Sequence, residues 1–157
     1  MGLDITYGRR AVLVPDADTD NYANGEYRAY ANPDFAGRAN GIADGVYRLE
    51  DVDGFRAGSY GGYNRWRSQL CQLAHKCEPS VIWARRPFEG VFAELIDFSD
   101  CEGVISPETC AKLARDFAEW DDRAKAMPDV DGYFYEKYQA WRKAFEVAAD
   151  GGFVMFH

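Results

Sequence analysis

Short apolar runs separated by turn residues fill the first third of the chain. Glycine, proline, asparagine and aspartate stand between them, a pattern typical of strands joined by turns. We predict β-strands at 3–7, 11–14, 46–49 and 54–60. The run at 91–98 is too short and too rich in β-formers for a helix, so it predicts a buried strand. Residues 153–156 predict a final strand.

Apolar residues recur at helical spacing in three later segments. The first helix should follow the glycines at 61 and 62 and end before Pro79. The second should begin at Ser106-Pro107-Glu108, a helix-capping sequence, and run to about 126. The third spans about 133–149. One shared core should therefore bury Trp66, Leu70, Leu113, Phe117, Trp141 and Phe145.

Strands first and helices later predict an α+β fold, with a mainly antiparallel sheet and about three helices packed on one face. The 157 residues suit a single α+β domain covering 1–157. The segment at about 15–45 holds several turn dipeptides, so we expect it to be rich in loops. The two Asp-Val-Asp-Gly runs, at 51–54 and 129–132, are interpreted as turns.

The charge of the chain narrows the classes of partner. Asp and Glu outnumber Lys and Arg by 26 to 18, which gives a net charge of -8. Such a charge repels phosphate backbones and anionic lipids, so general nucleic-acid or membrane binding is not expected. No apolar run approaches the roughly 20 residues of a membrane-spanning helix. A cytoplasmic location is the expectation.

The cysteines give no paired motif. Cys71, Cys77, Cys101 and Cys110 occur without a C-x-x-C spacing or an export signal, so we expect reduced thiols. Cys71, His75, Cys77 and Cys101 would form a zinc site only if the fold gathered them. We predict that folding needs no metal, and we expect no cofactor.

The stretch at 55–67 is the first candidate site. A strand, a Gly/Ser turn and a helix start follow one another there, which directs free backbone N–H groups and a positive helix end at an anion. Arginines can pair a phosphate, and tyrosines can stack on a planar ring. The predicted ligand-binding residues are Arg56, Ser59, Tyr60, Tyr63, Asn64 and Arg67, with His157 reaching them from the last strand. An ordinary strand-to-helix turn explains the same residues equally well. If the pocket exists, Arg67→Ala should weaken binding and leave the fold intact.

The acidic stretch at 97–103 is the second candidate. Asp97, Asp100 and Glu102 can bind a hard cation or act as acid and base toward a phosphodiester or glycosidic bond. Alternation along the predicted strand would place Asp97 and Ser99 on one face. A solvated turn before Ser106 explains these carboxylates as well, and we favour that interpretation.

Four blocks of the sequence resemble a group of small proteins from tailed phages and prophages. They are the opening Met-Gly-Leu-Asp-Ile, the block Phe-Arg-Ala-Gly-Ser-Tyr-Gly-Gly-Tyr-Asn-Arg-Trp-Arg, the block Phe-Ser-Asp-Cys-Glu-Gly, and the ending Gly-Gly-Phe-Val-Met-Phe-His. Gly61 and Met155 depart from the group's usual serine and acidic residue. The resemblance implies a phage accessory gene, with counter-defence as a reasonable class, and no particular reaction.

Three functions stay open from the sequence. The first is a phage accessory protein that binds and sequesters a small, anionic, nucleotide-like ligand and is not an enzyme. The second is a hydrolase that uses Asp97, Asp100 and Glu102. The third is an acidic inhibitor of a host nucleic-acid-binding complex, whose partner would be a host defence protein. A homo-oligomer is compatible with each.

Overall fold

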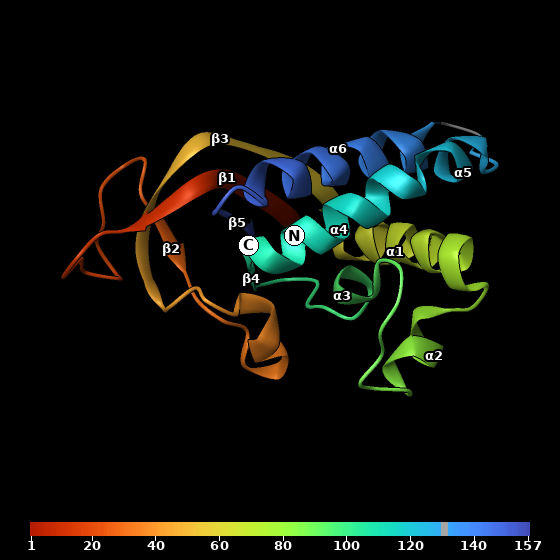
Figure 1. The fold of residues 1–157 in the computed structure, drawn as a ribbon, viewed down its shortest axis with the longest axis horizontal. Coiled ribbons are helices and arrows are strands. Elements are labelled where there is room, and N and C mark those ends of the chain that lie inside the picture. The colour runs from red at the N-terminus through yellow and green to blue at the C-terminus, as the bar shows by residue number, and fades with distance from the viewer. Residues whose placement is uncertain (130–131) are drawn as a thin grey trace.

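Two long strands, β1 (Gly2–Leu13) and β3 (Gly45–Ser59), form the centre of an antiparallel sheet. The computed structural model describes residues 1–129 and 132–157. The other strands are β2 (Tyr27–Ala29), β4 (Gly103–Ile105) and β5 (Phe153–Phe156). Their order is β2-β3-β1-β5-β4, and each neighbouring pair is antiparallel. The sheet curls into a half-barrel with several helices packed against it, which confirms the α+β prediction (Figure 1).

The long strands correct two predictions. The expected gap after residue 7 does not exist, because β1 continues through Gly8 and absorbs register shifts there as bulges. The turn predicted at 51–54 is also wrong, because these residues lie inside β3. Gly54 is required by close approach, since a Cβ there would lie 2.5 Å from the carbonyl oxygen of Ile5. In the second such run, Val130 and Asp131 lie outside the described residues.

The helices are three long and several short ones. The long helices are α1 (Tyr60–His75), α4 (Pro107–Glu119) and α6 (Tyr133–Ala148), close to the three predicted. The short ones are α2 (Pro79–Trp83), α3 (Ala93–Ile96), α5 (Asp121–Ala126) and the 3-10 helix η1 (Pro33–Ala39). The second predicted helix is in fact α4 and α5, because Trp120 leaves helical geometry between them. The loop-rich segment at 15–45 contains β2 and η1.

The strand predicted at 91–98 is wrong, because the segment forms α3. Phe92 takes a left-handed conformation with φ 57° before the first helical residue. Its backbone N–H donates to Oδ2 of Asp116 at 2.9 Å, which fixes that turn against α4. A short apolar run fits a buried strand or a buried helical turn equally well, so only the tertiary contact distinguishes the two.

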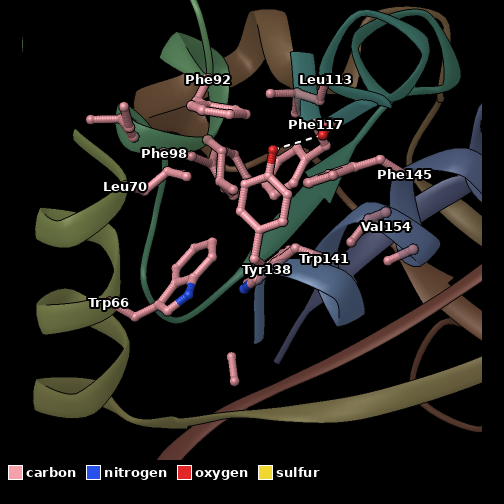
Figure 2. Close-up of a cluster of buried hydrophobic side chains, with 14 of the residues drawn as sticks. Trp66, Leu70, Phe92, Phe98, Leu113, Phe117, Tyr138, Trp141, Phe145 and Val154 are labelled. Atoms are coloured by element: carbon pink, nitrogen blue, oxygen red, sulfur yellow. Dashed lines mark hydrogen bonds between the residues drawn. The ribbon is translucent and has the colours of Figure 1, made fainter. Parts of the chain in front are cut away.

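The main core lies between the sheet and the long helices, and it buries all six residues predicted for it. Trp66 and Leu70 of α1 approach Tyr138 and Trp141 of α6 (Figure 2). The Tyr138 hydroxyl donates to the carbonyl oxygen of Phe117 at 2.7 Å, so this buried polar group is satisfied. A smaller cluster forms elsewhere, where Tyr47 and Phe153 meet edge to face.

Candidate functional site

The two candidate stretches of the sequence meet in the structure. Arg67 of α1 donates from Nη1 to the carbonyl oxygen of Phe98 at 2.6 Å and from Nη2 to Oδ1 of Asn64 at 2.5 Å. Asn64 in turn donates from Nδ2 to Oδ2 of Asp100 at 2.8 Å. Helix α1 is therefore bonded to the segment that follows α3, and the predicted basic and acidic stretches form one site.

Arg67 is the buried centre of this site, with a side chain packed between two aromatic rings. The residue is 4% exposed, and its Cζ lies 5.2 Å from the ring centroid of Tyr63 and 5.3 Å from that of Trp83. Hydrogen bonds and ring faces offset the cost of burying its charge. Its Nε, however, has no hydrogen-bond partner within the described chain. One donor of a fixed guanidinium is thus unused.

Two adjoining hollows flank Arg67, with volumes of about 350 Å³ and 400 Å³. Both are lined by Arg67, Trp83 and Asp100, so we treat them as one feature and call it the Arg67 cleft. Its remaining walls are Asn32, Pro33, Asp34, Phe35, Asn64, Ser68, Glu78, Pro79, Ser80, Arg86, Phe98, Ser99, Cys101 and Glu102. Cavities of this size hold small molecules in other proteins.

A second arginine lies at the accessible side of the Arg67 cleft. Arg86 has a half-exposed side chain, an ion pair of 2.6 Å with Oδ1 of Asp97, and a guanidinium 5.3 Å from the ring of Phe35. Arg38 lies behind it and donates to the carbonyl oxygens of Glu94 and Asp97. Burial lowers the pKa of Arg38. Arg86 is therefore a half-exposed arginine of the cleft, and its Nε and Nη2 both bond Oδ1 of Asp97.

Three residues of the first candidate stretch have structural partners. Ser59 caps α1, because its hydroxyl oxygen accepts from the backbone N–H of Gly62 at 3.0 Å. Tyr60 is half-buried and packs against the main core. Tyr63 is fully buried and stacks on Trp66, so its ring is closed to a ligand. Burial raises the pKa of Tyr63 to about 12, although the nearby Arg67 acts in the opposite direction.

Arg56 and His157 lie together at a different place, around Asp4 of β1. Arg56 donates from Nη1 to Oδ2 of Asp4 at 2.7 Å. His157 pairs with the backbone of Asp4 in both directions, and its Nε2 lies 2.9 Å from the hydroxyl oxygen of Thr6. Neither residue lines the Arg67 cleft. The structure thus divides the predicted ligand-binding residues into a cleft group and a sheet group.

The three carboxylates of the second candidate stretch have separate partners. Asp97 pairs with Arg86, Asp100 accepts from Asn64, and Glu102 accepts from the Tyr30 hydroxyl at 2.9 Å. Burial and the bond to Glu102 raise the pKa of Tyr30. Each carboxylate thus has a partner of its own, and Asp100 and Glu102 both line the Arg67 cleft.

The chain between these carboxylates is a compact turn. The hydroxyl oxygen of Ser99 accepts from the backbone N–H groups of Cys101 at 3.2 Å and Glu102 at 3.1 Å. Because residue 97 ends α3, the expected strand alternation of Asp97 and Ser99 does not apply. Among the described residues, no group of three or more His, Cys, Asp or Glu side chains is placed to hold a metal ion.

Trp83, Arg86 and Phe35 are cleft residues that sequence reasoning missed. Trp83 and Arg86 stand close together in an otherwise acidic chain, which is the signal that would have found them. Trp83 was missed because helix α2 is too short to show a periodic pattern. Phe35 was missed because η1 lies in the segment that we interpreted as loops.

In the part of the chain that the structure describes, none of the helices has the length and apolarity needed to cross a bilayer. Comparison of the chain with protein-family models, with curated proteins and with solved structures gave no match.

Proposed function

We propose that the protein is a phage accessory protein that binds and sequesters a small nucleotide-like molecule in the Arg67 cleft. The observation that carries the proposal is the position of Trp83, whose side chain is 39% exposed and lines both hollows beside Arg67. A large aromatic ring that is fixed yet accessible offers a stacking surface for a base. The Nε1 of Trp83 donates to the carbonyl oxygen of Ile96 at 3.1 Å, which holds the ring in place.

The polar groups around Trp83 suit the other parts of such a ligand. Arg86 bonds Asp97 through Nε and Nη2, and its half-exposed Nη1 side can donate to a phosphate. Asp100 uses Oδ2 to accept from Asn64, and its Oδ1 has no hydrogen-bond partner among the described residues. That oxygen can accept from the exocyclic amine of a base. The carboxylates of Asp100 and Glu102 line the cleft and repel negative charge, so the cleft favours a ligand with few phosphates.

Binding is favoured over hydrolysis by the arrangement of the carboxylates. Asp97, Asp100 and Glu102 each bond a different group, namely Arg86, Asn64 and Tyr30, which favours a role in positioning a ligand over that of a paired acid and base. A protein that holds its ligand without converting it withdraws that ligand from solution. In a phage, that property suits the silencing of a host nucleotide signal.

The test measures binding and the fate of the ligand. Calorimetry on the full chain uses nucleoside monophosphates, diphosphates and cyclic nucleotides as probes, and heat release followed by mass spectrometry identifies what was bound. Trp83→Ala should weaken binding by about 5- to 150-fold, since stacking of a base on an aromatic ring contributes about 1–3 kcal/mol. Arg56→Ala is the matched control, because it removes an arginine outside the Arg67 cleft.

Each other outcome counts against the proposal. Absence of binding to every probe, with no small molecule in the native protein, rejects it. Release of a converted nucleotide indicates a hydrolase. Binding that Arg56→Ala weakens and Trp83→Ala leaves unchanged moves the site to the sheet.

A further inference from the structure

The end of α1 brings two thiols together. The Sγ atoms of Cys71 and Cys77 lie 4.0 Å apart, and neither is in a disulfide. Cys71 is buried within the last turns of α1, and Cys77 is half-buried just after the helix ends. Between them Lys76 has a left-handed backbone, with φ 55°, and its N–H donates to the carbonyl oxygen of Gln72. This helix cap turns the chain back, so residues six apart in the sequence meet.

We propose that Cys71 and Cys77 are a modification site, a dithiol that a peroxide converts reversibly into an intramolecular disulfide. A disulfide needs an S–S distance of about 2.05 Å, so the sulfurs must approach by about 2 Å. Cys77 lies after the C-cap residue Lys76 and so outside the regular helix, which makes it the partner that can move toward Cys71.

The reaction has two steps. The thiolate of Cys77 attacks one oxygen of the peroxide, an S–O bond forms, the O–O bond breaks, and the second oxygen leaves as water after taking a proton. The Sγ of Cys71 then attacks the Sγ of Cys77, the S–S bond forms and the S–O bond breaks. The departing hydroxide takes the proton of Cys71 and leaves as water. Two electrons pass from the two sulfurs to the peroxide.

Accessibility sets the order of these steps. Cys77 is the partner that solvent reaches, whereas Cys71 is fully buried. Burial, followed by the neighbouring Cys77 and Glu78, raises the pKa of Cys71 to about 12, which keeps that thiol protonated at neutral pH. Cys77 is therefore the residue that is oxidised first, and Cys71 resolves it.

The other two cysteines have no such partner in the described chain. The thiol of Cys110 donates to the carbonyl oxygen of Ile105 in the core, and Cys101 lies at the surface with its Sγ 3.4 Å from the hydroxyl of Ser99. Cys101 is therefore the matched control: it is exposed, but it has no second thiol in contact.

The test maps the disulfides of the full-length protein after treatment with hydrogen peroxide. Trypsin cuts after Arg67, Lys76 and Arg85, so Cys71 and Cys77 fall on two separate peptides, 68–76 and 77–85. We expect a linked pair of these peptides without reductant and two free peptides after dithiothreitol. Cys101→Ala should leave the linked pair unchanged. Cys71→Ala should leave Cys77 as a sulfenic acid that dimedone traps.

Three results would overturn the proposal in the wild-type protein, independently of how the variants fold. One is a Cys77 that reaches the sulfinic acid while Cys71 stays reduced. Another is two chains linked through Cys77 while Cys71 stays free. The third is a pair of peptides that both remain free and unmodified while Cys101 is oxidised.

Discussion

Trp66 and Arg67 are neighbours on α1 and almost equally buried, at 1% and 4% exposed, yet different physics holds each of them. Trp66 stacks on Tyr63, Phe134 and Trp141, and its contribution scales with the apolar area it removes from water. Arg67 is held by hydrogen bonds to Phe98 and Asn64, and it contributes only while those partners stay in place. One side of α1 therefore supports the core and the adjoining side positions the Arg67 cleft.

The largest effect should come from the core side of this comparison. Trp141 is fully buried, and its ring contacts Phe55, Tyr63 and Phe156. Trp141→Ala should reduce the free energy of unfolding by about 3–5 kcal/mol, because it removes a large aromatic group and leaves a cavity. Urea unfolding followed by circular dichroism measures this, and a loss below about 1 kcal/mol would contradict the packing.

The cleft side should show a smaller effect. Arg67→Ala leaves the carbonyl oxygen of Phe98 without its donor, and an unsatisfied buried group costs about 1–3 kcal/mol. From the sequence we expected this variant to keep its stability. The structure changes that expectation, because Arg67 is buried and not exposed to solvent. The same urea unfolding experiment tests it.

Arg67→Lys is the informative companion to that variant. Lysine keeps the charge but has no planar fork, so it cannot bond Phe98 and Asn64 in the same geometry. We expect Arg67→Lys to be destabilised as well. If Arg67→Lys is as stable as the wild type, a positive charge at this position is sufficient, and the planar hydrogen-bonding geometry of arginine is not needed.

The smallest effect on stability at neutral pH should come from Tyr63, which contacts both Trp66 in the core and Arg67 in the cleft. Its hydroxyl has no hydrogen-bond partner among the described residues, so Tyr63→Phe should change stability little near pH 7. At alkaline pH the two proteins should diverge. Burial raises the pKa of Tyr63 from 10.0 to about 12, so the unfolded chain loses this proton first. The wild type therefore loses stability from about pH 10 to about pH 12.

Thermal unfolding between pH 8 and pH 11 in about half-unit steps measures this divergence, and the slope for one proton has an upper limit of about 1.4 kcal/mol per pH unit. Tyr63→Phe should show a shallower decline than the wild type. If the stability of both proteins declines identically, the pKa of Tyr63 is the same in the folded and the unfolded state, which would contradict the prediction.

The periodic spacing of apolar residues correctly predicted the long helices, because each of them buries one apolar face in the core. Trp66, Leu70 and Trp141 lie in the core as their helical spacing indicated. The strand predicted at 91–98 was wrong because Phe92 is fixed by Asp116, a residue far along the chain. Residues 51–54 were interpreted as a turn because Gly54 looks like a turn glycine, although it serves the close approach of β1 and β3.

The candidate site was predictable only in part for a similar reason. Asn64, Arg67 and Asp100 carried a chemical signal of their own, and the sequence named all three. Trp83 and Phe35 became cleft residues through the placement of α2 and η1, which no local pattern encodes. Arg56 looked equivalent to Arg67, but Asp4 on a neighbouring strand is its partner.

The outer edge of β3 limits how this protein can aggregate. β2 pairs only with residues 45–47 of β3, so the rest of that edge has no neighbouring strand among the residues that the structure describes. Side chains of α6 occupy part of it, with Lys137 donating to the carbonyl oxygen of Arg56 and the Tyr133 hydroxyl to that of Ala57. Another chain adding a strand there would have to displace both donors and bury the charge of Lys137. Such a lysine-protected edge disfavours the growth of intermolecular sheets.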